Sequence, residues 1–433
     1  MKNIFTLLTL FSFTSIFAID RFVDPNLSSG NGTTLFTTIT SAVNAAVNGD
    51  RIIVATNTYN EGTLTIDKSL KIIPQTAGAT INFNANINIA GFSGMKLEII
   101  GFNLGIYSIS SNPISNGIAT NRAKVSIIEC SISNVVFDND FYELNLLKSI
   151  ISGNATFRFG NIVSNSMLNC YLMDESLTNQ NAMDKNFIVN NTITNDTFIF
   201  NDNYKFILSN NSLKNLFVSK WVLALTNTNY IMNNVFNSNC KLYFASFFQL
   251  SSNWGGCGPD VSCYLQLGSV GLVYNFKFVN NKFLGSILYA RRNTSLVFPN
   301  AFGCLVYGSS YNTVVNEATY SSTATDCPNV YANGFFEWSY NGVTNLQTLN
   351  GSLVYTNISG PTNDIDGGNP NHDYYDIDLT INDRGINGGP YSQLNYNATN
   401  PNNSKAFIFD LEMPTDLFEG QNVNIKAKGY HKN

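Results

Sequence analysis

The chain has 433 residues, of which 44% are hydrophobic, only 12% are charged and 66 are asparagines. A formal net charge of −5 and a pI near 5.1 argue against a nucleic-acid groove and against binding to an anionic membrane surface. Because charge is scarce, side-chain amides and hydroxyls must keep the surface of a soluble chain hydrated.

Residues 1–18 resemble an export signal in composition. One lysine precedes an apolar stretch from Ile4 to Phe17, and a small residue, Ala18, follows it; this is typical of a signal peptide cleaved after Ala18. A membrane anchor is the alternative, but the stretch is short for a span and no second apolar stretch follows. We therefore expect an extracellular or cell-surface protein without a transmembrane segment.

Residues 19–50 predict an N-terminal cap that contains one amphipathic helix. In LFTTITSAVNAAVNGD, apolar residues recur at helical spacing, and Gly49-Asp50 ends the pattern. Short β segments follow directly, in RIIVA, LTI and LKII. The expected apolar face of the helix consists of Phe36, Ile39, Val43, Ala46 and Val47.

An asparagine recurs in similar phrases, such as FIVNNTITN and FILSNNSLKN, at a nearly constant step. Glu129 and Ser149 hold the same place earlier in the chain. The repeated asparagines, separated by 21, 20, 23 and 47 residues, are Asn169, Asn190, Asn210, Asn233 and Asn280.

This period predicts a solenoid. Within each step, apolar and polar residues alternate over four to six positions, which indicates strands rather than helices. Three short strands and three turns fit into about 20 residues. We predict an all-β fold, a right-handed parallel β-helix over residues 51–395.

The repeated asparagines are expected to serve shape rather than chemistry. A tight turn between strands needs a residue that tolerates the left-handed region, and asparagine does so better than most residues. Stacked coils would place these side chains above one another, so that their amides form a structural ladder.

Two segments carry a family resemblance. NGDRIIVATNTYNE is similar to the phrase D-G-D-x-I-x-V-x-x-G-x-Y-x-E, with Asp50, Tyr59 and Glu61 among the matching residues. The matches in DRGINGG are Asp383, Arg384, Gly385, Gly388 and Gly389. The chain thus resembles secreted bacterial β-helix proteins of the pectate-lyase-like superfamily, of the kind found in Bacteroidetes. The resemblance implies the fold and leaves the reaction open, because the superfamily includes lyases, hydrolases and esterases.

An insertion over residues 247–271 interrupts the repeat. Its Trp254 and Tyr264, with Tyr289 nearby in the sequence, are candidates for stacking on a sugar ring. Cys257 and Cys263 flank a short loop and could form a disulfide. The alternative is a loop that covers the side of the solenoid with a small core of its own.

Two further clusters are candidates for chemistry. Arg291 and Arg292 are the one local arginine pair, and a lyase would use such a residue as a base next to a divalent ion; the alternative is a surface charge. An acidic run near residue 370 resembles an oxygen-rich Ca²⁺ loop, or else a set of Asx turns that ends the last coil. Its candidate ligands are Asp364, Asp366, Asp376 and Asp378.

The C-terminal residues 396–433 predict two strands around Glu419-Gly420. They suggest either a short β cap or part of an immunoglobulin-like module.

We expect a monomeric scaffold that binds a polysaccharide or cell-surface glycan without catalysis. A polysaccharide lyase that cleaves an acidic glycan by β-elimination is the alternative. A purely structural coat or spacer is the third hypothesis.

Overall fold

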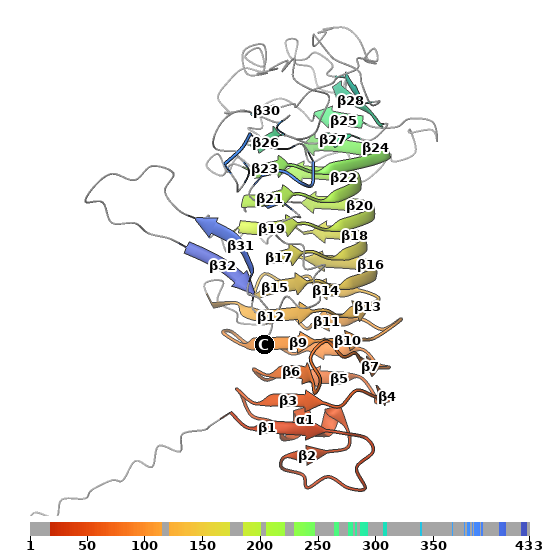
Figure 1. The fold of residues 1–433 in the computed structure, drawn as a ribbon, viewed down its shortest axis with the longest axis vertical. Helices are drawn as coiled ribbons and strands as arrows, with labels where there is room; N and C mark the ends of the chain where they lie inside the picture. Colours follow the sequence, from red (N-terminus) through yellow and green to blue (C-terminus); the bar gives the residue numbers. More distant parts are fainter. Residues whose placement is uncertain are drawn as a thin grey trace, which may run out of the picture.

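The structure is a computed structural model that describes residues 18–114, 121–173, 185–200, 205–220 and 229–246 as long stretches. Shorter described pieces are 264–267, 276–279, 282–283, 286–292, 306–309, 338–339, 366, 376, 379–381, 383, 385–389, 391–392, 407–412 and 426–430. The described part is mostly β structure in long parallel sheets, with one α-helix. Its strands stack along one long axis (Figure 1).

The first large sheet has 13 strands, and the neighbours are parallel except for the last pair. In order, the strands are β2 (Leu35–Phe36), β1 (Asp20–Val23), β3 (Arg51–Val54), β6 (Lys71–Pro74), β9 (Lys96–Ile100), β12 (Ala123–Ile128), β15 (Tyr142–Leu147), β17 (Gly160–Val163), β19 (Lys185–Val189), β21 (Lys205–Ser209), β23 (Asn229–Met232), β26 (Phe276–Val279) and β30 (Trp338–Ser339).

The second large sheet has 14 strands, and the chain alternates between it and the first. Its main path is β4 (Thr58–Tyr59), β7 (Ile81–Phe83), β10 (Phe102–Asn103), β13 (Ser131–Ile132), β16 (Ile150–Phe157), β18 (Ser166–Leu172), β20 (Thr192–Phe200), β22 (Ser212–Lys220), β24 (Val235–Ser246) and β27 (Lys282–Phe283). A branch consists of β5 (Leu64–Ile66), β8 (Ile87–Ile89), β11 (Ile109–Ser111) and β14 (Val135–Phe137).

Two small sheets complete the described strands. One contains β25 (Tyr264–Leu267), β28 (Ser286–Arg292) and β29 (Val306–Ser309). The other is an antiparallel hairpin of β31 (Phe407–Glu412) and β32 (Lys426–Tyr430). The hairpin therefore has the two strands that the sequence predicts around Glu419-Gly420.

The shape of one coil, meaning the chain from one strand of the first sheet to the next, changes at β16. Up to that strand each coil adds two short strands to the second sheet. β13 pairs with the start of β16 and β14 with its end, across a register shift between Ile151 and Asn154. From β16 onward a single long strand replaces the two. The expected three strands in every coil are thus correct only for the first coils.

Coil length also varies more than the asparagine step predicts. Paired residues in the first sheet are 28 positions apart between Lys96 and Lys124, but only 16 apart between Leu144 and Gly160. Turns absorb these differences, so the strands stay in register.

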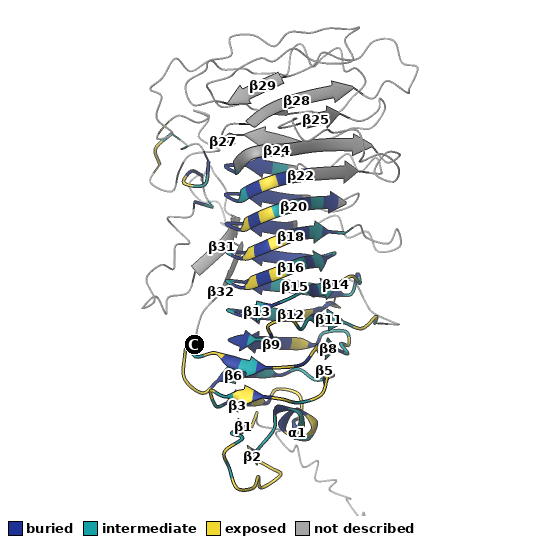
Figure 2. Ribbon diagram, turned by 90° about the vertical axis from the view of Figure 1, so that its right-hand side faces the viewer, coloured by how far each residue is buried: buried dark blue, intermediate teal, exposed yellow. Residues whose placement is uncertain are grey.

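Alternate side chains of the strands fill the interior, and one column of them runs through nine strands of the first sheet. In the first sheet every member of this column is 0% exposed, and burying each aliphatic side chain contributes about 1.5–3 kcal/mol. In Figure 2, buried residues recur on the strands along the described part of the stack. The column consists of Ile52, Ile72, Ile99, Ile127, Leu146, Ile162, Ile188, Leu208 and Ile231.

Helix α1 (Ile39–Ala45) lies at the N-terminal end of the stack, near β1 and β3 (Figure 1). The Thr38 hydroxyl accepts a hydrogen bond from Ser41 N, and both Glu61 carboxylate oxygens accept bonds from the first turn. The helix is shorter than its apolar pattern predicts. Phe36 belongs to β2, and Val47 lies beyond the helix with 42% exposure.

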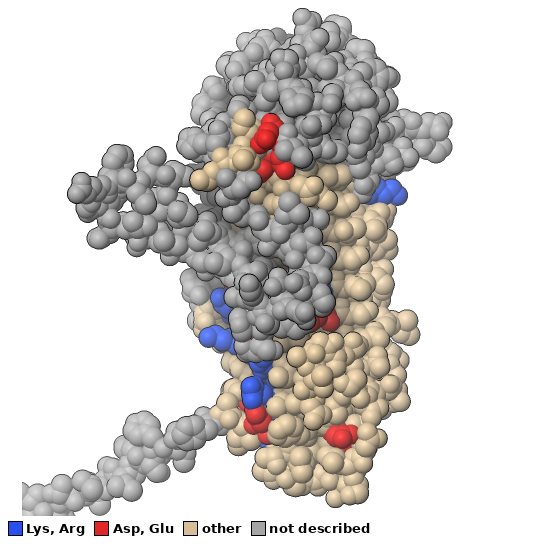
Figure 3. All heavy atoms as spheres, viewed as in Figure 1, with Lys and Arg blue, Asp and Glu red and all other residues tan. Residues whose placement is uncertain are grey.

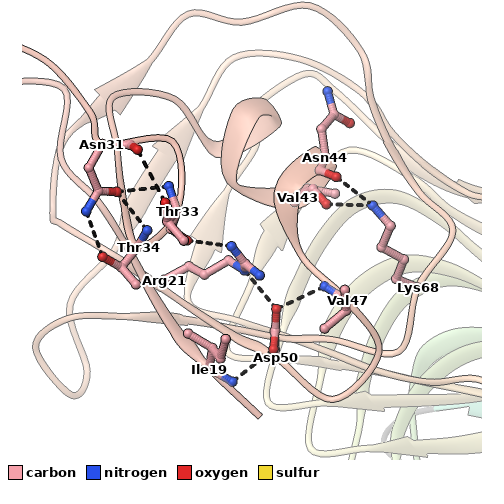
Figure 4. A network of polar contacts seen from close by, with 10 residues as sticks. All are labelled: Ile19, Arg21, Asn31, Thr33, Thr34, Val43, Asn44, Val47, Asp50 and Lys68. Carbon is pink, nitrogen blue, oxygen red and sulfur yellow. Dashed lines mark hydrogen bonds and ion pairs between the residues drawn. The ribbon is translucent and has the colours of Figure 1, made fainter. Parts of the chain in front are cut away.

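A buried ion pair joins this end to the first coil (Figure 4). Asp50 is 0% exposed and accepts hydrogen bonds from Ile19 N (2.9 Å), Val47 N (2.9 Å) and Arg21 Nε (2.7 Å). Burial alone would raise the pKa of Asp50, but the hydrogen bonds from Val47, Ile19 and Arg21 outweigh it and hold the pKa below its usual value.

A C-terminal segment, described at residues 383, 385–389 and 391–392, lies on the outer face of the first sheet. Asn233 Nδ2 donates to Asp383 O at 2.8 Å, and Asn210 Nδ2 donates to Ile386 O and Gly388 O at 2.9 and 2.7 Å. The Tyr391 ring packs edge-on against a buried apolar cluster on this face. We call residues 383–392 the C-terminal strap. The apolar cluster consists of Phe187, Val189, Ile207 and Met232.

In the described residues, no helix has the length and hydropathy needed to cross a membrane.

Candidate functional site

The predicted corner asparagines have the left-handed backbone expected of them. Asn190, Asn210 and Asn233 have φ of 59°, 56° and 55°. They stand above one another, because Asn190 N donates to Ser209 O and Asn210 N donates to Met232 O. Earlier coils have other residues at this corner, with φ between 49° and 58°, namely Glu129, Lys148 and Ser164.

The continuous amide ladder runs through the residue after each corner. Asn191 N and Nδ2 both donate to Asn211 Oδ1, at 2.8 and 3.0 Å. Asn191 Nδ2 also donates to Ile162 O, and the same pattern repeats one coil on, where Asn211 donates to Asn234. These side chains are at most 3% exposed. The ladder residues are Ser149, Asn165, Asn191, Asn211 and Asn234.

Asn169 belongs to a different column, on the outer side of the second sheet. Its Nδ2 donates to Asn154 Oδ1 at 2.8 Å, and its Oδ1 accepts from Asn195 Nδ2 at 3.0 Å. Asp196 continues this column, since its Oδ1 accepts from Asn215 Nδ2 at 2.8 Å.

A column of rings runs beside these polar groups. Cys170 and Leu172 are both 0% exposed, so Tyr171 between them points outward. The same alternation places Phe198 outward, and both rings are half-buried.

The two rings are stacked, with their centroids 5.0 Å apart and their planes 5° from parallel. Parallel aromatic rings at this centroid distance are in favourable contact.

We call these two columns the aromatic–amide face. In strand register, Tyr171 and Phe198 are followed by positions 217 and 243. Exposed residues recur at one place on β16, β18, β20 and β22 (Figure 2), and this place lies earlier on each strand than the face. The described members of the face are half-buried, except for Asn169 and Asn215, which are 9% exposed. The described members are Asn154, Thr156, Asn169, Tyr171, Asn195, Asp196, Phe198 and Asn215.

Asp196 is the one charged side chain among the described members of the face. Burial and then the charge of Asp196 raise the pKa of Tyr171, so its hydroxyl stays protonated at neutral pH. Most of the described surface in Figure 3 carries neither lysine or arginine nor aspartate or glutamate. The face therefore offers ring surface, amide donors and acceptors, and one carboxylate.

A second cluster, of arginine and aspartate, lies at a corner on three neighbouring coils. Arg158 Nε donates to Asp138 Oδ1 at 2.6 Å, and its Nη1 lies 3.5 Å from Asp140 Oδ1. Arg122 Nε donates to Asp140 O at 2.8 Å, and its guanidinium stacks over the Phe159 ring. Each cation is therefore already engaged with an acceptor or a ring. Residues 18 to 20 positions apart meet here, a spacing that the repeat period could have revealed.

The structure brings some sequence-based candidates together in register. Tyr264 of β25 is opposite Tyr289 of β28, and Gln266 is opposite Arg291. Arg292 is opposite Leu267. This arrangement aligns the two tyrosines and sets both arginines on the same strand as Tyr289.

Other candidates lie outside the described residues. They are Trp254, Cys257, Cys263, Asn280, Asp364 and Asp378.

Of the proposed Ca²⁺ ligands, Asp366 and Asp376 are described. Asp366 N donates to Asp383 Oδ1 at 2.8 Å, and the Asp376 carboxylate accepts from Asp383 N and Gly389 N. These are turn contacts within the C-terminal strap and its neighbours. Among the described residues, no three His, Cys, Asp or Glu side chains are placed to hold a metal.

Comparisons with protein-family models, with characterised proteins and with solved structures find no match to the chain.

Proposed function

We propose that the chain is an exported right-handed parallel β-helix of the pectate-lyase-like superfamily. It acts as a monomeric, noncatalytic scaffold that binds a polysaccharide or cell-surface glycan.

The roles of the motif residues support the superfamily assignment. Asn48 Oδ1 accepts from Ser69 N, and the Tyr59 hydroxyl donates to Val23 O and Ala55 O. Asp50 and Glu61 join the helix to the first coils, as described above. Every one of these contacts is structural, which explains why the motif indicates a fold and leaves the reaction open.

The aromatic–amide face is the observation that carries the glycan-binding proposal. Sugar rings combine apolar C–H faces with hydroxyl groups, and they are bound by aromatic surfaces flanked by amides and carboxylates. Tyr171 and Phe198 supply the rings, and Asn169 and Asp196 supply polar groups one column away.

A glycan array followed by titration calorimetry tests this function. We expect a subset of glycans to bind, and Tyr171→Ala to weaken that binding about tenfold, or roughly 1.4 kcal/mol. Ile106→Ala is the matched control, because Ile106 is an 84% exposed apolar residue outside the face. An empty array, or equal binding by Tyr171→Ala, would contradict the proposal.

The arginine–aspartate cluster favours the lyase as the second candidate. It unites Arg122 and Arg158 with Asp138 and Asp140 on adjacent coils, and a lyase needs a base next to carboxylates. The test follows the absorbance of unsaturated uronates with acidic polysaccharides, with and without Ca²⁺. Product formation that Arg158→Ala abolishes would replace the scaffold proposal with an enzyme.

A further inference from the structure

The chain enters the fold at Ile19, whose main-chain nitrogen meets a buried carboxylate (Figure 4). Ile19 N donates to Asp50 Oδ1 at 2.9 Å, and Ile19 O accepts from Arg51 N at 3.1 Å. Strand β1 begins at the next residue. The first coil therefore holds both main-chain polar groups of Ile19, although Ala18 and Ile19 are themselves exposed.

The Asp50 carboxylate can accept more at this place than it does. Its Oδ2 accepts from Arg21 Nε at 2.7 Å and from Val47 N at 2.9 Å. Among the described residues, its Oδ1 accepts from Ile19 N alone. A carboxylate has about four acceptor positions, so Oδ1 can take a second hydrogen bond. Because Asp50 is 0% exposed, bulk water does not supply it.

Cleavage of the peptide bond before Ile19 would supply a stronger donor. Hydrolysis breaks the bond between Ala18 C and Ile19 N, and water gives its hydroxyl to the carbonyl carbon and a proton to the nitrogen. The amine that forms takes up a further proton at neutral pH. The nitrogen then carries a positive charge and three donors in place of one. Since Ile19 is 40% exposed, the ammonium stays partly hydrated, which limits the cost of desolvation.

The charges around this position leave Asp50 as the partner of the new ammonium. Arg21 engages the other carboxylate oxygen of Asp50 and also donates to Thr33 O. Helix α1 has no acidic residue in its first turn and no basic residue in its last. The remaining charged groups nearby are already engaged: Asp20 pairs with Arg51, and Lys68 Nζ donates to Val43 O and Asn44 O.

We propose that removal of residues 1–18 is a maturation step of the fold, in which an export peptidase cleaves the Ala18–Ile19 bond and the new α-ammonium of Ile19 forms an ion pair with Asp50. This inference rests on the export part of the proposed function and does not depend on glycan binding. The uncleaved chain has only an amide hydrogen bond at this place, so its N-terminal end is less stable than that of the mature chain.

Two chains that differ by one residue test the ion pair. One begins at Ile19 and the other at Ala18, and both continue to the last residue. In the longer chain Ile19 N is an amide, which keeps the hydrogen bond to Asp50 but carries no charge. At pH 7 we expect the Phe22 amide of β1 to exchange its hydrogen about tenfold more slowly in the shorter chain. The Leu208 amide, far along the stack, should exchange equally in both.

Substitutions identify the partner of the ammonium. The difference between the two chains should disappear in Asp50→Asn. It should persist in Asp20→Asn, because the Asp20 carboxylate is exposed and already paired with Arg51.

The dependence on pH tests the ion pair without any substitution, so it also serves if Asp50→Asn does not fold. Pairing with Asp50 should raise the pKa of the Ile19 ammonium above its unfolded value near 8. The protection is therefore fully present below that value and is lost as pH rises through the folded pKa. The ratio of the two Phe22 exchange rates, measured at each pH, should approach one.

Sequencing the N-terminus of the full chain after export from a bacterial host completes the test. We expect Ile19 as the first residue. Another first residue, equal Phe22 exchange in the two chains at pH 7, or a difference that persists in Asp50→Asn would overturn the inference while the proposed export stands. An uncleaved chain retained in the cell would overturn the proposed export as well.

Discussion

At each corner of the later coils the two adjacent asparagines have different partners. The first, such as Asn210, has the left-handed backbone and donates outward to the C-terminal strap. The second, such as Asn211, points into the stack and joins two coils through its amide. A glycine at the first position could adopt the left-handed backbone but could not form the side-chain hydrogen bonds. An aspartate at the second position could not donate a hydrogen bond to the neighbouring coil.

Asn211→Ala is expected to destabilise the protein by about 3 kcal/mol, since it leaves buried groups on Asn191 and Ile188 without partners. Urea unfolding measures the change. Thr192→Ala serves as the control, because Thr192 is exposed and next to the ladder, and should cost less than about 0.5 kcal/mol. Equal effects of the two substitutions on the free energy of unfolding would show that the ladder does not stabilise the protein.

Because of Asp50, the stability of the protein should fall with pH in the acid range. Its folded pKa is held below the unfolded value near 3.9, so its contribution is fully present above that value. The contribution is lost as pH falls through the folded pKa. Asp50→Asn should cost about 3–5 kcal/mol at neutral pH, because it leaves the buried Arg21 charge unpaired, and should flatten the loss of stability below pH 4.

Asp20 provides the matched comparison for Asp50. It forms a bidentate pair with Arg51, but both side chains are well exposed. Asp20→Asn should therefore cost less than about 1 kcal/mol. Thermal unfolding across the acid range compares the two variants, and a larger effect at Asp20 than at Asp50 would contradict this account.

At the scale of elements, α1 depends on its surroundings. Seven residues are too few for a helix that is stable in isolation. The Glu61 carboxylate accepts from Ile39 N at 2.7 Å and from Thr40 N at 2.8 Å, which satisfies first-turn donors and offsets the helix dipole.

Glu61→Ala is expected to destabilise this end by about 1–2 kcal/mol. Hydrogen exchange at Ile39 and Thr40 should rise accordingly, while exchange at Leu208, deep in the stack, should stay unchanged. Glu61→Gln, which retains a hydrogen-bond acceptor, should destabilise this end less than Glu61→Ala. Uniform acceleration at all three amides would instead mean that Glu61 supports the whole stack.

The sequence predicts elements well where the local pattern is repeated. Asn190, Asn210 and Asn233 show the corner at steps of 20 and 23 residues, and alternation shows the strands. The sequence does not reveal which of two adjacent asparagines belongs to the ladder, because the two differ only in the direction of their side chains. The aromatic–amide face was missed because positions 171, 198, 217 and 243 are separated by unequal steps of 27, 19 and 26 residues. Because the turns between these strands differ in length, the positions have no regular spacing in the sequence, although strand pairing aligns them in the structure.

At the scale of the molecule, the C-terminal strap contacts coils that lie 150 to 178 residues away in the sequence. It binds them mainly through its own main-chain carbonyls, so its sequence gives little sign of the contact. Phe187 and Val189 are both 0% exposed on what would otherwise be the outer face of the first sheet. An exposed apolar patch at a sheet face favours association between molecules.

We therefore expect Asn210→Ala combined with Tyr391→Ala to loosen the strap while the stack stays folded. The double variant loses the hydrogen bonds to Ile386 O and Gly388 O and the ring contact with Phe187. Proteolysis within residues 383–392 and binding of a hydrophobic dye should both increase several-fold, while the urea midpoint of the stack changes little. Asn215→Ala is the control, because it also removes a side-chain amide but lies on the second sheet. A double variant with wild-type dye binding would mean that the apolar cluster under the strap is buried by contacts other than those of the strap.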